Sequence, residues 1–293
     1  MNNKTMEVSS FIDLLKTHAC EHLFDDECYA RIENVRQQFG HLQSNYVIWE
    51  APLSIEEKSV DCSILFPYHT SYGKNYGLEM DYETCSSESI VPCCGFNLSK
   101  TADVRELFYA ARKILPMMIP KEVIIALWPQ IEKISSMAFD WHGGVSDIAY
   151  MKGRSAGKKL KIFLQYLAPE AALDILKRLE WSGNLFVLQC VLNECIHYCK
   201  SEKVIIDFSI SPQGISSKVG IGVSLKDQQS KTVASFLDFL TSKGLCLPEK
   251  ARDVLKFIEA GTPSVENRIT QFKLPFMGGG VSMAKVYLGQ KLL

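Results

Sequence analysis

The sequence predicts an α+β fold in which a closed antiparallel ten-stranded β-barrel is surrounded by helix pairs. Three observations predict it. Helical patterns come in pairs, each later pair is followed by two strands, and the two faces of those strands differ in polarity. Paired strands joined by short turns form antiparallel hairpins, whereas alternating strands and helices would give a parallel sheet. No proline-rich or low-complexity linker divides residues 1–293, so we expect a single domain.

The N-terminal segment, residues 1–40, is predicted to be mostly helical from the spacing of its apolar residues. Four short strand-like runs follow, and glycine, serine, proline and asparagine separate them. These runs lie near 45–51, 61–68, 76–84 and 93–99. A helical pattern then runs from 99 to about 115, where two prolines break it, and a second helix runs to about 135.

Beyond residue 135 the same order of elements repeats. Two strands are expected at 137–144 and 159–167. Helix pairs and strand pairs then alternate, with helices at 169–181 and 184–199, strands at 203–211 and 217–225, helices at 229–243 and 248–260, and strands at 269–276 and 283–290. The last six strands therefore form three pairs, and about ten strands are expected in all.

The strands alternate between apolar and polar side chains, which point to opposite faces of a sheet. One face is uniformly apolar and must pack against the helices. The opposite face of the last five strands carries Lys161, Lys218, Lys273 and Lys285 with Phe163, Tyr287 and glycines, and Asp207 as the balancing carboxylate. Lysines that converge in an enclosed space repel one another unless an anion compensates them. The lysine-rich face therefore favours a closed barrel, and an open sheet with this face solvated or dimerised is the alternative.

Bulk properties exclude several classes of protein. The formal net charge is −1, which gives no indication of nucleic-acid binding. The first residues lack the basic start and long apolar run of a signal peptide, and the apolar stretches are too short to insert in a membrane. The ten cysteines have no framework spacing. We therefore expect a cytoplasmic protein whose cysteines are mostly reduced thiols in the core.

Four further motifs could have a metal-binding, catalytic or phosphate-binding role, but for each we prefer a structural interpretation. His18 and His22 could form a metal pair at helical spacing, but a polar helix face is the simpler reading, and no metal site is predicted. His142 is a minor acid–base candidate at a strand end. Met277 and the glycines at 278–280 lie between two strands and are typical of a hairpin turn rather than a phosphate loop. The segment 153–159 lacks the spacing of a phosphate loop and leads into a strand, so we reject a nucleotide site.

The layout of helix, helix, strand and strand over residues 60–290 resembles the aromatic prenyltransferases of the ABBA type, whose fold is the PT-barrel. Fungal indole prenyltransferases, bacterial relatives and cyanobactin peptide prenyltransferases have this architecture. The motifs that carry the resemblance are Lys161-Ile162-Phe163 and Lys285-Val286-Tyr287, which look like the family's Lys-x-Tyr strands, and Ser217-Lys218, which looks like its Ser-Arg strand.

The sequence also departs from this pattern. Gly220 and Gly222 stand where a further lysine and tyrosine are usual, and the arginine usual on an early strand is replaced in the region of Gly95 and Asn97. No DDxxD motif is present, and the nearest acidic run begins at Asp25. Without such a motif, the sequence fits a mechanism in which cationic side chains, rather than magnesium, neutralise the leaving group.

The resemblance implies a transferase that moves a prenyl group from an allylic diphosphate, dimethylallyl or geranyl, to an aromatic small molecule or a side chain of a ribosomal peptide. No cofactor would be required besides this co-substrate. The implied diphosphate-binding residues are Arg154, Lys161, Lys218, Lys273, Lys285 and Tyr287. Phe163, Trp141 and Tyr287 would shield the carbocation.

The resemblance also implies a catalytic base on the strand 76–84. Glu79, or alternatively Asp81, would take the proton that the attacked nucleophile loses. The alternative to this enzyme is a non-catalytic α+β protein that binds a peptide or dimerises through its polar sheet face. Binding of an allylic diphosphate separates the two hypotheses.

Overall fold

The computed structural model describes residues 4–18, 20–54, 59–66, 75–81, 89–95, 120–140, 144–150, 159–225 and 230–293. Their strands are β1 (Met6–Glu7), β2 (Gln43–Ser44), β3 (Tyr46–Pro52), β4 (Asp61–Phe66), β5 (Asn75–Asp81), β6 (Ser89–Gly95), β7 (Gly144–Tyr150), β8 (Leu160–Leu167), β9 (Val204–Ser211), β10 (Gly214–Val223), β11 (Val265–Met277), β12 (Gly280–Val281) and β13 (Lys285–Leu292). Their helices are α1 (Val8–Thr17), α2 (Asp26–Phe39), α5 (Lys121–Asp140), α6 (Pro169–Arg178), α7 (Leu185–Cys199), α8 (Ser230–Ser242) and α9 (Pro248–Glu259). The helix predicted at 99–115 lies outside the described residues.

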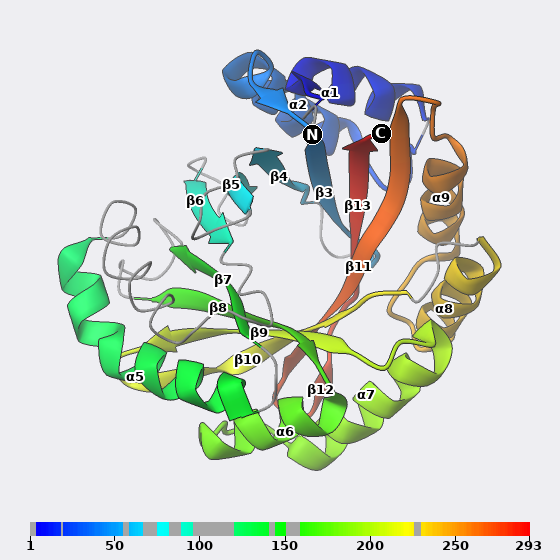
Figure 1. The fold of residues 1–293 in the computed structure, drawn as a ribbon. Coiled ribbons are helices and arrows are strands. Elements are labelled where there is room, and N and C mark those ends of the chain that lie inside the picture. Colours follow the sequence, from blue (N-terminus) through cyan, green and yellow to red (C-terminus); the bar gives the residue numbers. More distant parts are fainter. Residues whose placement is uncertain are drawn as a thin grey trace.

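A curled antiparallel sheet organises the molecule (Figure 1). Among the described strands, eleven belong to it, in the order β10-β9-β8-β7-β6-β5-β4-β3-β13-β11-β12. The strand β10 also pairs with β11, from Val219 opposite Phe276 to Val223 opposite Phe272. The late strand β13 lies between β11 and the early strand β3. The predicted mixture of helices with an antiparallel sheet is thus confirmed.

The helices α5 to α9 lie along the outside of the curled sheet, and α1 and α2 lie together near the C-terminal end of β13 (Figure 1). Local signals fix where several helices begin. The Asp25 side chain accepts a hydrogen bond from the backbone N–H of Cys28 at 2.9 Å, and Asn184 caps α7 in the same way. Pro169 and Pro248 start α6 and α9, where a missing backbone N–H costs nothing.

The apolar face of the sheet is buried against these helices, as the strand alternation predicted. Ile206 of β9, Ile221 of β10 and Val286 of β13 have no exposed surface. Phe236 of α8 packs on Phe272 of β11 with ring centroids 4.8 Å apart. Each such side chain contributes about 1.5–3 kcal/mol by leaving water. The polar residues of the same strands are therefore left on the inner face of the curl.

One predicted strand is wrong. Residues 137–140 belong to α5, and the strand of this region, β7, begins only at Gly144. The buried residues Ile131, Ile134 and Met137 recur every third position, which continues the apolar stripe of a helix beyond residue 135. The short apolar run that suggested a strand is the last turn of this stripe.

His18 and His22 do not share a helix, because α1 ends at Thr17. The ring of His18 lies 2.9 Å from the amide nitrogen of Asn267. The buried carboxylate of Asp253 in α9 accepts from the backbone of His22 at 2.7 Å and lies 3.3 Å from its ring. Both histidines thus attach the N-terminal segment to the body of the protein. Within the part of the chain that the structure describes, no cluster of metal-ligating residues is found.

Two further expectations concern the cysteines and the membrane. Cys20, Cys28, Cys62, Cys190, Cys195, Cys199 and Cys246 are free thiols, and all of these but Cys190 are buried. Burial raises the pKa of Cys20 to about 12, so this thiol stays protonated and packs as an apolar group. Among the described helices, none has the length and apolar character that crossing a membrane requires.

Candidate functional site

Two lysines and a carboxylate from three strands meet on the inner face of the curled sheet. The Oδ1 atom of Asp207 in β9 lies 3.4 Å from Nζ of Lys161 in β8. Its Oδ2 atom lies 2.9 Å from Nζ of Lys273 in β11. The sequence analysis placed all three residues on this face, and the structure brings them into contact.

The absence of a side chain at Gly220 allows this contact. Gly220 of β10 pairs with Asp207 on one side, and β10 pairs with β11 on the other. A Cβ atom built on Gly220 would overlap the Asp207 carboxylate and lie 2.6 Å from Cε of Lys273. The glycine that departs from the prenyltransferase pattern thus lets an acidic and a basic side chain meet across β10.

A second ion pair lies beside the first. Oε1 of Glu50 in β3 is 2.9 Å from Nζ of Lys285 in β13. Tyr287 is opposite Glu50 in the backbone register and hydrogen-bonds to its carboxylate. Lys285 is in turn opposite Lys273 in the register of β13 and β11. We call Lys161, Asp207, Lys273, Lys285 and Glu50 the paired-charge cluster.

The charges of the cluster stabilise one another. Burial alone would raise the pKa of Glu50, but the ammonium groups of Lys285 and Lys273 lower it to about 2. Burial also opposes the ionisation of Asp207, and Lys161 and Lys273 outweigh it and lower its pKa. Burial lowers the pKa of Lys273, which its carboxylate neighbours partly offset. Both carboxylates are therefore ionised at neutral pH.

An aromatic ring borders the cluster. The Nζ atoms of Lys161 and Lys273 lie 5.1 Å and 6.0 Å from the ring centroid of Phe163. Within about 6 Å, the negative face of a ring attracts a cation. Phe163 is opposite Asp207 in the register of β8 and β9, so the ring and the carboxylate flank the same two ammonium groups.

The other predicted site residues are placed as follows. Lys218 of β10 is exposed and adjoins a register irregularity between Ile215 and Val219. Glu79 and Asp81 lie in β5, where the backbone pairs Glu79 with Ser63 of β4. Trp141, His142 and Arg154 lie outside the described residues.

Sequence reasoning missed Glu50 as the partner of Lys285. The alternation that sorted the later strands is also present in 46–52, where Val47, Trp49 and Ala51 are buried in the core. The opposite parity holds Glu50, so applying the same rule to this strand would have identified it. Each of the three lysines of the cluster is therefore in an ion pair with a carboxylate of the protein itself.

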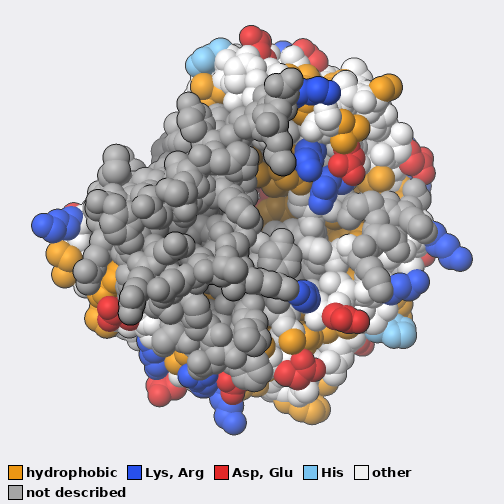
Figure 2. Space-filling model, in the orientation of Figure 1, with side chains coloured by type: hydrophobic (Ala, Val, Ile, Leu, Met, Phe, Trp, Pro, Cys, Tyr) orange, Lys and Arg blue, Asp and Glu red, His pale blue; other side chains and the backbone are white. Residues whose placement is uncertain are grey.

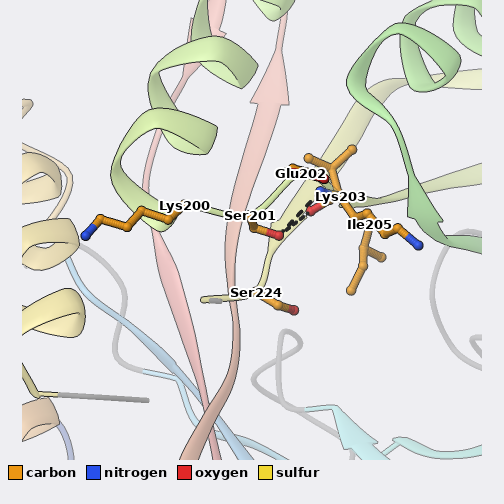
Figure 3. A pocket seen from close by; sticks show the side chains of 7 residues that line it. Lys200, Ser201, Glu202, Lys203, Ile205 and Ser224 are labelled. Carbon is orange, nitrogen blue, oxygen red and sulfur yellow. Dashed lines mark hydrogen bonds between the residues drawn. The ribbon is translucent and has the colours of Figure 1, made fainter. Parts of the chain in front are cut away.

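The molecular surface is hollowed close to basic and acidic side chains, with hydrophobic side chains in the depth of the hollow (Figure 2). A separate pocket of about 310 Å³ lies where β9 begins and β10 ends (Figure 3). Its lining includes Lys200, Ser201, Ile205 and Ser224. Ile205 has the same strand parity as Asp207, so the pocket adjoins the inner face on which the cluster lies.

Acid should weaken the folded state through Glu50. Its pKa is lowered from 4.5 to about 2, so its contribution to the free energy of unfolding is complete above about pH 4.5 and is lost as the pH falls toward 2. We expect urea unfolding of the wild type to depend more steeply on pH in this interval than that of Glu50→Gln. Glu194→Gln, which removes an exposed carboxylate paired with Lys243, should keep the wild-type dependence. Equal slopes for the wild type and Glu50→Gln would contradict the assignment.

Among known proteins, solved structures resemble this chain, and they define its class of fold. No protein-family model matches the sequence, and neither does any curated protein. Solved structures do match over nearly the whole chain, and prenyltransferases are among them. The predicted resemblance to barrel-type prenyltransferases is therefore confirmed for the fold.

Three of these structures define the similarity. The 6-dimethylallyltryptophan synthase from Micromonospora olivasterospora, in complex with DMASPP and Trp, is 8% identical, with a TM-score of 0.62 and 97% of each chain covered. The prenyltransferase PriB, in a complex with product diphosphate, is 11% identical, with a TM-score of 0.59 and coverage of 96% of this chain and 95% of PriB. AnaPT from Neosartorya fischeri is 11% identical, with a TM-score of 0.55 and coverage of 98% and 92%.

Proposed function

We propose that this protein is a prenyltransferase that moves a dimethylallyl or geranyl group from an allylic diphosphate to an aromatic small molecule or a side chain of a ribosomal peptide. The observation that carries the proposal is a buried group of lysines on the inner face of a sheet whose fold is that of prenyltransferases. Two of the similar structures hold a diphosphate or DMASPP. We further propose that ten strands, β3 to β11 together with β13, close into a barrel, which the β10–β11 pairing supports.

In this proposal the lysines take the role that magnesium has in other prenyl-transferring enzymes. Lys161, Lys273 and Lys285 hold the diphosphate, together with Tyr287, and stabilise the negative charge that develops on the leaving group. Arg154 and Lys218 add positive charge to the same site. Departure of the diphosphate leaves an allylic carbocation, which the faces of Phe163, Tyr287 and Trp141 shield.

The acceptor then attacks the carbocation, and a new carbon bond to the prenyl group forms. The attacked position loses a proton to Glu79, with Asp81 as the second candidate. An efficient base lies about 3 Å from the proton that it removes. We propose that the acceptor enters beside the pocket of Figure 3, whose serine, lysine and isoleucine side chains suit a ligand with polar and apolar parts.

Thermal stability with a prenyl donor tests the proposal. Dimethylallyl or geranyl diphosphate should raise the melting temperature with and without magnesium, because a ligand of the folded state stabilises it. Mass spectrometry should then detect transfer to an aromatic amino acid, a phenol or a peptide in the presence of EDTA. No shift with either donor, and no transfer, would contradict the proposed function.

Loss of a cluster lysine should weaken donor binding. In Lys161→Ala or Lys285→Ala, a charge-assisted contact of about 1.5–3 kcal/mol disappears, which corresponds to about ten- to hundredfold weaker binding. Isothermal titration calorimetry with the donor measures this change. Lys243→Ala, which removes a surface lysine paired with Glu194, should bind as the wild type does. Wild-type affinity in both cluster variants would remove these lysines from the site.

The second candidate function is a non-catalytic protein that binds a peptide or dimerises. It is favoured by the ion pairs of the cluster, because Asp207 and Glu50 already contact the lysines that a diphosphate would need. This candidate predicts no response to any allylic diphosphate.

A further inference from the structure

The carboxylate of Asp207 contacts the ammonium groups of Lys161 and Lys273 in the way that an anionic ligand would. Its two oxygens each contact a different ammonium group, Oδ1 that of Lys161 and Oδ2 that of Lys273. Lys161 lies on β8 and Lys273 on β11. The strands β9 and β10 lie between β8 and β11, and Asp207 of β9 bridges the two lysines. A phosphate oxygen that bound both lysines would occupy the same place, so Asp207 and such an anion exclude each other.

The surroundings leave Asp207 little freedom within the cluster. It is 6% exposed, the Phe163 ring flanks the same two ammonium groups, and the backbone of Gly220 lies directly beneath the carboxylate. The carboxylate must therefore turn out of this position before another anion can contact both ammonium groups.

The charges around Asp207 also indicate that its carboxylate must move away when another anion binds. The paired-charge cluster has three lysines and two carboxylates, and the buried Asp61 lies opposite Glu50 in the backbone register. Among these six described residues, three are positive and three are negative. A diphosphate brings several more negative charges into a region of low dielectric, where like charges repel strongly.

We propose that Asp207 is an internal competitor for the anion site, which contacts Lys161 and Lys273 in the resting protein and is displaced when a diphosphate binds. This inference rests on the proposed function for the identity of the anion. It predicts that Asp207 weakens the affinity for the prenyl donor and accelerates release of the diphosphate product. Asp207 is thus a residue that sets affinity, and it takes no part in bond making.

Binding of inorganic diphosphate tests this inference apart from prenyl transfer. Asp207→Asn keeps the shape of the side chain and removes its negative charge. At constant ionic strength, its dissociation constant for inorganic diphosphate should be about tenfold or more below that of the wild type, a difference of about 1.4 kcal/mol. Asp174→Asn removes a partly exposed carboxylate of α6 that pairs with Arg178, and this variant should bind diphosphate as the wild type does. An Asp207→Asn affinity equal to or weaker than that of the wild type would overturn the inference.

Two outcomes need a second measurement. If Asp207→Asn is unfolded without ligand, because Lys161 and Lys273 lose their common partner, diphosphate should restore its far-ultraviolet circular dichroism while sodium chloride of equal ionic strength should not. No recovery with diphosphate overturns the inference. If Asp207→Asn binds diphosphate more tightly but the wild type transfers no prenyl group, the inference stands and the proposed function fails. If the wild type transfers a prenyl group but binds diphosphate as tightly as Asp207→Asn does, the proposed function stands and the inference fails.

Discussion

Glu79→Gln is expected to bind the allylic diphosphate as the wild type does and to turn over about 10²- to 10⁴-fold more slowly. The amide has nearly the shape of the carboxylate but cannot accept the proton that the acceptor loses. The register of β5 places Glu79 opposite Ser63 of β4, which is the neighbour of the strand that holds Glu50. Chromatography of the prenylated product gives the turnover, and calorimetry gives the donor affinity.

Asp81→Asn is the matched comparison, because Asp81 lies two residues further along the same strand. The variant with the larger loss of turnover and unchanged donor affinity identifies the base. If both variants turn over at the wild-type rate, the base does not lie on β5. If Glu79→Gln loses donor affinity to the same extent as turnover, Glu79 acts in binding instead.

Gly220→Ala is expected to lower the free energy of unfolding by about 1–3 kcal/mol and to weaken donor binding at the same time. The added methyl group would occupy the space of the Asp207 carboxylate and of the Lys273 stem. Both side chains must then move, and the ion pairs of Asp207 with Lys161 and Lys273 cannot keep their geometry. Urea unfolding and donor titration measure the two effects.

Gly279→Ala provides the control for this substitution. A Cβ atom on Gly279 would meet nothing within 4 Å, and the residue lies in the turn between β11 and β12. Its stability and donor affinity should match those of the wild type. A Gly220→Ala protein that is as stable and binds as tightly as Gly279→Ala would show that the cluster tolerates a side chain on β10.

The sequence predicted the later half of the fold well because side chains there obey two clear periods. Alternation in 204–211 sends Ile206 and Ile210 to the helices and Asp207 to the inner face, and the structure agrees. Helical spacing located α6 to α9 to within a few residues. The prediction failed at 137–140, where an apolar run of a few residues is compatible with either period and only the buried stripe of the preceding turns decides.

The sequence predicted which lysines belong to the candidate site, but not which carboxylate each of them contacts. Parity placed Lys161, Lys273 and Lys285 on one face, but it carries no information on which carboxylate meets which lysine. That pairing depends on the register between strands far apart in the chain, such as Lys285 of β13 and Glu50 of β3. Lys218 shows the same limit, because the irregularity beside it follows from hydrogen bonding with β9 and leaves no mark in the alternation.

The position of β13 between β3 and β11 has a consequence for biosynthesis. One neighbour of β13, the strand β3, leaves the ribosome early, whereas β11 and β13 themselves are synthesised much later. Until β13 pairs with it, β3 exposes an unsatisfied backbone edge, which attracts other chains. Nascent protein should therefore depend on chaperones for most of its synthesis and become resistant to protease only after the final hairpin docks, since contacts so distant in sequence form slowly.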